Sequence, residues 1–173
     1  MKKYGFTLIE LMVVIVILGI LLAMAVPAAG LILKKAKIAQ ARSDASVVVG
    51  SMMKYRLEYN RWPPAKAISA QNGYETDKDW MEIMNPPPDA ARQKDNFHMI
   101  TFLTPGPGTL DDVGNYVDPW GQVFLYQVDD DGDGMIDHPA GGSELRAQVI
   151  AWTTAPEDKN KPPHEKTYIG SWE

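Results

Sequence analysis

The first third of the chain divides into an apolar block and a block of alternating apolar and polar faces. Between residues 11 and 33 no side chain is charged, and lysines flank this block on both sides. At about 1.5 Å per residue, a helix over these positions would be roughly 34 Å long, enough to cross a hydrocarbon core of about 30 Å. The pattern therefore predicts one membrane-spanning helix near the N-terminus.

Three other interpretations compete for this apolar block. A cleaved secretory signal would be cut near residues 23–25 or 28–30, but the apolar block is long for such a signal and the apolar run that leads into it contains Glu10. An ordinary signal anchor would explain the length of the block but not the glutamate. A buried core helix is disfavoured, because an uncharged run of this length is typical of membrane spans.

A second periodic pattern predicts that the helix continues to about residue 60. Apolar residues recur there at alternating spacings of three and four, which places them on one face of a helix. This apolar stripe consists of Ile38, Ala41, Ala45, Val48, Met52, Tyr55 and Tyr59. Asn60 and the sequence Trp62-Pro63-Pro64 end the helix. An amphipathic helix of this kind is expected to cover a sheet.

Turn residues divide the remaining residues, 61–173, into short elements. Prolines and glycines are dense, but aromatic and aliphatic residues lie between them, which indicates loops of a packed domain rather than disorder. We expect a short helix at residues 77–84. β-Branched and aromatic residues predict strands at 122–128 and 145–153, and a short last strand at 168–172. The sequence thus predicts an α+β fold, with a long N-terminal helix packed on a small antiparallel sheet.

Glu10 is the most informative residue of the N-terminal segment. An ionisable group in a spanning helix costs on the order of 2.5–3.5 kcal/mol, so a charged partner is expected. No basic residue lies between Lys3 and Lys34 to supply one. Cleavage after Gly5 would create an α-amino group at Phe6, four residues before Glu10. That amine can pair with Glu10 of its own helix or, because it lies at a free end, with Glu10 of a neighbouring helix.

The N-terminal sequence resembles the leader and cleavage motif of type IV pilins and type II secretion pseudopilins. The matching residues are Lys2, Lys3, Tyr4, Gly5, Phe6, Thr7, Leu8, Ile9, Glu10 and Leu11. The resemblance implies that a prepilin peptidase cuts after Gly5 and methylates the new terminal residue, Phe6. It also makes Glu10 the assembly glutamate, and Pro27 matches the proline that kinks the helix in this family.

Two further stretches make the chain similar to the major pseudopilin of type II secretion. Residues 55–63 resemble the end of its long helix, where a tyrosine-rich turn runs into arginine, an aromatic residue and proline. Asp118-Pro119-Trp120-Gly121 resembles its Asp-Pro-Trp-Gly motif and also suits a type I turn. Trp172 is similar to a tryptophan at the end of those proteins. Residues 64–117 do not align with the family.

The hydrophobic pattern and the resemblance together divide the chain into four parts. Residues 1–5 are the expected leader, 6–33 the membrane-spanning assembly helix, 34–60 its amphipathic continuation and 61–173 a periplasmic α+β head. The implied function is a filament-forming pseudopilin that supports protein export across the outer membrane. Implied partners are further copies of the chain, minor pseudopilins, the prepilin peptidase, and the bacterial inner membrane with its assembly platform.

An acidic loop directly follows the predicted strand at 122–128 and has the ligand spacing of a calcium loop. Carboxylates lie at positions one, three, five and nine and glycine at position six, the order in which such a loop folds around its ion. The candidate ligands are Asp129, Asp131, Asp133, the main-chain carbonyl of Met135, and Asp137. Position twelve is Ala140 instead of the usual glutamate, so Glu144 or waters would complete the set.

A solvated acidic turn is the alternative interpretation of this loop, since aspartate and glycine are common in turns. Against it, aspartates this close together repel one another unless a cation lies among them. The family resemblance also implies a calcium site after the Asp-Pro-Trp-Gly region. Oxygen ligands and the absence of cysteine disfavour zinc. The expected cofactor is therefore a structural Ca²⁺ ion that closes the loop.

Charge and motifs exclude several functional classes. The net charge of −5 and the scattered lysines and arginines give no basic footprint for nucleic acid. His98, His138 and His164 lie far apart, and no phosphate-binding loop, serine elbow or zinc-protease motif is present. We therefore expect a protein that is not an enzyme.

Two alternatives to a pseudopilin follow from the same residues. A type IV pilin for adhesion, motility or DNA uptake shares the N-terminal motif, but the Asp-Pro-Trp-Gly stretch and the calcium loop favour the pseudopilin. A signal-anchored calcium-binding periplasmic domain that never polymerises would instead keep its leader or be cut near Ala25.

Overall fold

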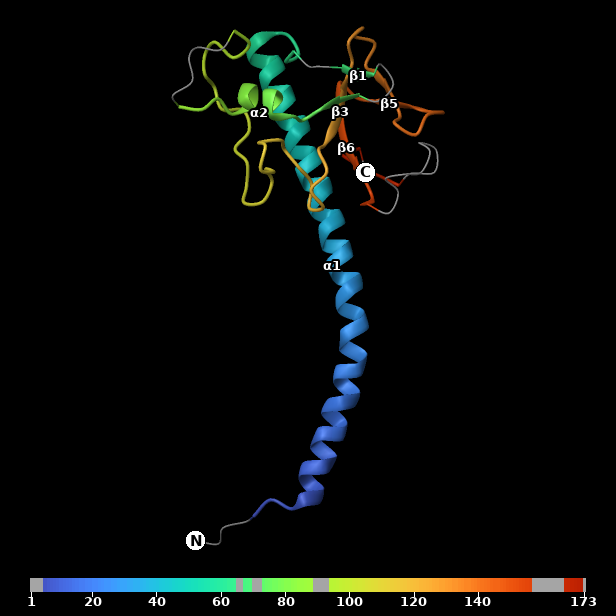
Figure 1. Ribbon diagram of the computed structural model, residues 1–173. Helices are drawn as coiled ribbons and strands as arrows, with labels where there is room; N and C mark the ends of the chain where they lie inside the picture. The colour runs from blue at the N-terminus through green and yellow to red at the C-terminus, as the bar shows by residue number, and fades with distance from the viewer. Residues whose placement is uncertain (1–4, 65–66, 70–72, 89–93, 157–166, 173) are drawn as a thin grey trace. The chain divides into compact units, whose positions relative to one another are not determined.

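The computed structural model describes residues 5–64, 67–69, 73–88, 94–156 and 167–172 (Figure 1). The side chains of residues 24–29 and 67–69 lie outside this description, and so does the expected helix kink at Pro27. The chain separates into two compact units, Met1–Lys37 and Ile38–Glu173. Each unit is described by itself.

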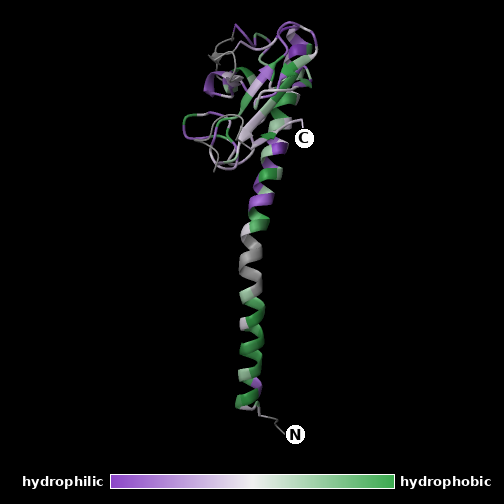
Figure 2. Cartoon of the chain, turned by 90° about the vertical axis from the view of Figure 1, so that its right-hand side faces the viewer, coloured by the Kyte–Doolittle hydropathy of each residue, from purple (hydrophilic) through white to green (hydrophobic). Residues whose placement is uncertain are grey.

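The first unit contains the N-terminal part of the long helix α1, which runs over Leu8–Tyr59. Its large apolar side chains are exposed, from Leu8 at 78 % to Leu33 at 65 %, and Figure 2 shows the apolar colouring of this part. None of the helices in the described part of the chain combines the length and hydropathy needed to cross a membrane.

The second unit begins with the amphipathic part of α1. Five residues of the predicted stripe are completely buried, namely Ala41, Ala45, Val48, Met52 and Tyr55. All but Ala41 belong to a core cluster with aromatic and aliphatic side chains from the sheet and from a short helix. The period-3.6 pattern of the sequence is therefore confirmed as the face of α1 that forms the core.

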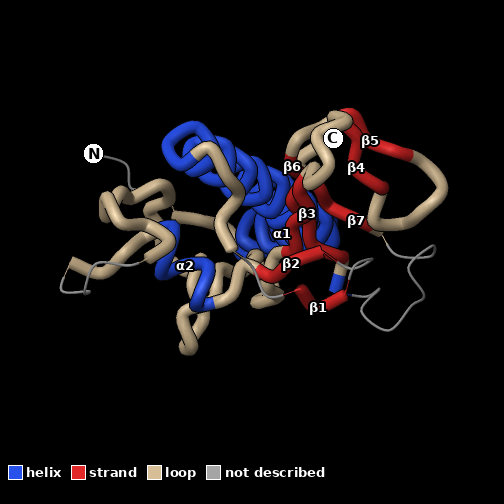
Figure 3. Tube along the Cα trace, turned by 90° about the horizontal axis from the view of Figure 1, so that it is seen from above, coloured by secondary structure: helices blue, strands red, loops and turns tan. Residues whose placement is uncertain are grey.

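A five-stranded antiparallel sheet packs on this face of α1, in the order β1-β2-β3-β6-β7 (Figures 1 and 3). The strands are β1 (Ala67–Ser69), β2 (Gly73–Glu75), β3 (Leu125–Val128), β6 (Val149–Thr154) and β7 (Tyr168–Gly170). The N-terminal helix on a small antiparallel sheet confirms the predicted α+β fold class.

The short helix α2 (Lys78–Met84) confirms the helix expected at residues 77–84. Asp77 caps it, because its Oδ1 accepts the main-chain N–H of Trp80 at 2.9 Å. Trp80 and Met84 are buried in the core, and the indole Nε1 of Trp80 lies 3.3 Å from the Sδ atom of Met52 on α1. Figures 1 and 3 show α2 and the sheet on opposite sides of α1.

Two predicted strands differ from the structure. The strand predicted at 122–128 begins only at Leu125, because the preceding residues pair with Tyr116 and Val117 instead of with the main ladder. The strand predicted at 145–153 is two strands, β5 (Glu144–Arg146) and β6. Between β5 and β6 the chain passes from a two-stranded sheet to the five-stranded sheet. A run of apolar residues does not reveal this change of sheet.

The hairpin of β4 (Met135–Asp137) and β5 forms a second small sheet beside the main one (Figures 1 and 3). Ile136 of this hairpin packs with Ile150 and Trp152 of β6 in a separate cluster, whereas Val149 and Ala151 belong to the core under α1. β6 is therefore buried on both faces, which explains its continuous apolar sequence.

Candidate functional site

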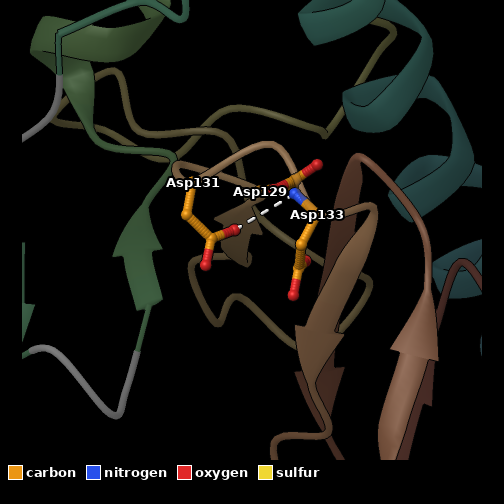
Figure 4. A group of neighbouring side chains, drawn as sticks. All are labelled: Asp129, Asp131 and Asp133. Carbon is orange, nitrogen blue, oxygen red and sulfur yellow. Dashed lines mark hydrogen bonds between the residues drawn. The ribbon is translucent and has the colours of Figure 1, made fainter.

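The acidic loop lies between β3 and β4, at the position predicted from the sequence. Carboxylate oxygens of Asp129, Asp131 and Asp133 all lie within 4.8 Å of one another. Figure 4 shows these three side chains gathered around one small volume. Asp129 is buried at 5 % exposure, whereas Asp131 and Asp133 are exposed.

Main-chain hydrogen bonds hold the three carboxylates in this arrangement. Both oxygens of Asp129 accept N–H groups, from Gly132 at 2.7 Å and from Gly134 at 3.0 Å. The side chain of Asp131 accepts the N–H of Asp133 at 3.3 Å (Figure 4), and that of Asp133 accepts the N–H of Met135 at 2.8 Å. Each aspartate thus fixes the chain two to five residues further on, which turns the loop around one centre.

The two glycines allow the loop to make this turn. Gly132 and Gly134 have φ angles of 82° and 79°, in the left-handed region that side chains with a Cβ rarely adopt. Their N–H groups then point at Asp129. The Asp-Gly-Asp-Gly pattern is therefore the local reason why the carboxylates converge.

The carboxylates line a cavity of about 330 Å³ that also includes part of the β4–β5 hairpin. Met135, Asp137 and Glu144 lie on its wall, and Asp137 is paired with Glu144 across the hairpin. The structure thus brings three predicted ligands into one cluster and places the other two on the same cavity. Glu144, the expected substitute for the missing ligand at position twelve, faces this cavity as well.

The donor set fits calcium by its chemistry. Oxygen atoms of carboxylates are the ligands that Ca²⁺ prefers, and the cavity leaves room for waters to complete six to eight ligands. The exposed positions of Asp131 and Asp133 leave an entry path from solvent. A close cluster of three acidic groups could hold a metal ion.

One residue outside the loop contacts it directly and a second is linked to the loop through the first, and the sequence patterns indicated neither. The indole N–H of Trp62 donates a 3.2 Å hydrogen bond to the main-chain carbonyl of Asp129. Arg56, in the last turn of α1, stacks on Trp62 with its Cζ atom 4.4 Å from the ring centroid. An arginine and a tryptophan six residues apart near a helix end carry no signal that assigns them to a distant loop.

The pKa of the Asp129 carboxyl reflects these surroundings. Burial raises this pKa, but hydrogen bonds from Gly132 and Gly134, a contact with Asp131 and the positive charge of Arg56 outweigh burial and leave it below its ordinary value. Asp129 is therefore ionised at neutral pH, as a calcium ligand must be.

The N-terminal candidates lie at the start of α1. The main-chain N–H and the hydroxyl of Thr7 donate to Glu10 Oε2 at 2.8 and 2.7 Å, and the N–H of Glu10 lies 3.3 Å from the Thr7 hydroxyl. This reciprocal capping box is readable from the Thr-x-x-Glu spacing. Gly5 and Phe6 precede the helix and are exposed, Phe6 at 81 %, so the expected cleavage position is accessible.

The two described histidines, His98 and His138, do not join the acidic cluster. His98 Nδ1 lies 2.7 Å from Glu58 Oε1, and the ring of His138 packs edge-on against Trp172 at 5.2 Å. His164 lies outside the described residues. Each described histidine thus has a packing or pairing role, as its lack of any motif indicates.

Comparisons with known proteins extend the similarity beyond the N-terminus. Residues 1–26 match the prokaryotic N-terminal methylation motif. Over 125 residues the chain is 33% identical to the type II secretion system core protein G of Pseudomonas aeruginosa, which covers 72% of this chain and 73% of that protein. Over 62 residues it is 44% identical to the protein of the same name from Aeromonas hydrophila, covering 36% of this chain and 43% of that protein. No solved structure gives a significant match.

Proposed function

Since the chain belongs to the family of the type II secretion system core protein G, the major pseudopilins, we propose that it is processed at Phe6 and assembled through Glu10. Its function is that of a pseudopilin subunit in protein secretion, and the family implies a pilus-like filament built with other pseudopilins. The observation that carries this conclusion is the similarity over most of the chain together with the N-terminal methylation motif.

This similarity also decides between the alternatives raised by the sequence. A type IV pilin would share the N-terminal motif, but the curated relatives are secretion proteins that align well past it. Pseudopilins are structural subunits of a filament, and this agrees with the expectation that the chain is not an enzyme.

In our proposal, the uncharged residues 11–33 anchor the chain in the bacterial inner membrane, with the second unit on the periplasmic side. The exposed apolar side chains of the first unit support this role, because apolar surface of this extent needs a non-aqueous or protein partner. Lys34 and Lys35 follow the apolar block at the position where a polar headgroup region would begin.

Glu10 is the proposed assembly contact. After cleavage by a prepilin peptidase, the amine of Phe6 becomes a cation close to a carboxylate that two donors of Thr7 already hold in place. In a filament, the same amine lies at a free end and reaches Glu10 of a neighbouring subunit. An ion pair at low dielectric would then fix the relative position of two helices.

The acidic loop is the proposed site of a structural Ca²⁺ ion. Asp129, Asp131, Asp133, Asp137 and the carbonyl of Met135 are the proposed ligands. A bound ion would remove the repulsion among the carboxylates and close a loop that no disulfide holds, since the chain contains no cysteine. By binding only the folded chain, it would raise the stability of the second unit.

Mass spectrometry of the protein isolated from its native membrane tests the processing step. The expected N-terminal residue is an N-methylated Phe6, without residues 1–5. An intact leader on assembled filaments, or a cut near Ala25, would contradict the proposal.

A further inference from the structure

We propose that Arg56 is a built-in counter-charge of the acidic loop, which stabilises the loop without its ion and weakens the binding of Ca²⁺. The inference rests on the proposed calcium site and concerns a residue outside the ligand set. It assigns Arg56 a role in setting the affinity of that site.

Contacts connect Arg56 to the loop through a single intermediate. Its guanidinium stacks on the Trp62 ring at 4.4 Å, and the Trp62 indole N–H donates to the carbonyl of Asp129 at 3.2 Å. Asp129 in turn holds the loop through Gly132 and Gly134. Three segments, namely the end of α1, the chain that follows it and the loop after β3, therefore meet at Trp62.

The hydrogen bonding of Arg56 is incomplete. Its Nη1 atom is buried and has no hydrogen-bond partner among the described residues. Leaving a charged donor buried and unpaired costs free energy unless another interaction offsets it. Stacking on Trp62 is one such offset. Because the Trp62 indole also bonds to Asp129, the guanidinium lies near the acidic loop, and attraction to its aspartates is a second offset. Stacking on Trp62 and the nearness of the acidic loop thus both favour a positive charge at this position.

The same charge has opposite effects on the two states of the loop. Without an ion, the guanidinium attracts the clustered carboxylates and reduces their mutual repulsion. A divalent cation bound among those carboxylates is repelled by the guanidinium, which stays protonated at every accessible pH. Removing the charge should therefore destabilise the ion-free chain and tighten calcium binding.

Calcium titration calorimetry of the full chain in detergent micelles tests this inference, with wild type, Arg56→Gln and Arg56→Lys compared after chelator treatment. We expect Arg56→Gln to bind Ca²⁺ roughly fivefold to tenfold more tightly than wild type. Arg56→Lys keeps the charge and should stay within about twofold of wild type. Arg61→Gln removes a positive charge that pairs with Asp95 instead, and it should also leave the affinity unchanged.

Thermal melts of the same proteins give a second measurement, in which the melting temperature in chelator and its rise on adding Ca²⁺ should change in opposite directions. In excess chelator, Arg56→Gln should melt a few degrees below wild type, and the rise in its melting temperature on adding Ca²⁺ should exceed that of wild type. Circular dichroism of each variant checks that the fold is kept.

The outcomes separate this inference from the calcium site itself. If neither wild type nor Arg56→Gln binds Ca²⁺, the proposed site is wrong and the inference falls with it. If wild type binds Ca²⁺ but Arg56→Gln binds it equally or more weakly, the site stands and the role of Arg56 is wrong. An equal change in Arg56→Gln and Arg56→Lys would show that packing on Trp62, and not charge, is what matters.

Discussion

The hydroxyl of Thr153 donates a 2.6 Å hydrogen bond to the carboxylate of Asp118, and both side chains are buried. The other oxygen of this carboxylate accepts the main-chain N–H groups of Trp120 and Gln122 at 2.8 and 2.9 Å. Asp118 therefore closes the turn before β3 and joins it to β6. This explains physically why the Asp-Pro-Trp-Gly stretch begins with an aspartate.

Replacing Asp118 with alanine should lower the free energy of unfolding by about 2–4 kcal/mol, because three donors lose their acceptor. One of them, the Thr153 hydroxyl, is buried, and the two N–H groups of the turn are half-buried. Urea denaturation of the full chain in micelles measures this change. Asp111→Ala is the matched control, since its carboxylate accepts the N–H groups of Val113, Gly114 and Asn115 on a more exposed loop. It should cost about 1 kcal/mol, and equal losses would contradict this account.

Gly73 should not tolerate a side chain. Its φ angle is +74°, and a Cβ atom would lie 2.6 Å from the carbonyl oxygen of Tyr126 and 2.8 Å from the Trp152 ring. Gly73→Ala is therefore expected to lower the free energy of unfolding by about 2–4 kcal/mol.

Gly108 provides the control for this substitution, because it has a similar φ angle of +76° but open space around it. Gly108→Ala carries only the backbone cost of about 1–2 kcal/mol. Thermal melts of both variants compare the two costs, and a Gly73 variant as stable as the Gly108 variant would rule out the close packing of β2 on Trp152.

Asp44 is a buried acid of α1 whose charge should destabilise the fold. It is 7 % exposed, and its carboxylate accepts Gln40 Nε2 at 3.0 and 3.2 Å. Burial raises the pKa of the Asp44 carboxyl, the Gln40 hydrogen bond lowers it in part, and the charge of Asp118 raises it further. The folded chain thus holds this proton more tightly than the unfolded chain, so stability falls as pH rises from the ordinary carboxyl pKa through the raised value.

Asp44→Asn should remove this penalty and raise the melting temperature at pH 7 by about 2–4 °C. The difference from wild type should shrink as the pH is lowered toward about 4, where Asp44 of both the folded and the unfolded chain becomes protonated. Thermal melts over this pH range measure the effect. Asp112→Asn, at an exposed position, is the control and should show no such dependence; a parallel gain there would indicate a general charge effect.

The aspartates of the acidic loop should differ in their effect with and without calcium. Asp131→Ala should reduce the calcium-induced rise in melting temperature but should not lower the melting temperature in chelator. The substitution loses only a 3.3 Å hydrogen bond on an exposed side chain and removes one of the charges that repel one another. Asp129→Ala should lower both the calcium-induced rise and the melting temperature in chelator, since its carboxylate also accepts the N–H groups of Gly132 and Gly134. At a calcium concentration one hundred times the Kd, the wild-type ion would contribute about 2.7 kcal/mol.

Asp130→Ala is the control for these substitutions, because it removes the same charge from an exposed residue outside the cluster of three carboxylates. Its calcium-induced rise should stay close to that of wild type. If all three variants lost the rise equally, net charge and not ligand geometry would explain calcium binding.

Glu10→Ala should insert in the membrane but assemble poorly, because the amine of Phe6 would lose its partner. Filament yield in sheared fractions, compared with total membrane-bound protein, measures this loss. Thr7→Val removes the hydroxyl that donates to Glu10 but keeps the carboxylate, so it should retain most of its filament yield. Normal filaments from Glu10→Ala would contradict the proposed pairing.

Local patterns were sufficient for the features whose causes are local. The buried stripe of α1 follows from period-3.6 spacing, the start of α2 follows from the cap Asp77, and the convergence of Asp129, Asp131 and Asp133 follows from the Asp-Gly spacing. Each of these depends on residues within a few positions of one another, so the sequence by itself determined them.

Tertiary structure alone decided the features that depend on distant segments. The hairpin of β1 and β2 has little hydrophobic pattern of its own and forms because β2 pairs with β3, about fifty residues later. The run at residues 145–153 belongs to two sheets because Ile136 covers the second face of β6. Arg56 reaches the acidic loop only because Trp62 bonds to Asp129, 67 residues away. Contacts of this range are set by how the whole core packs, and no local pattern encodes them.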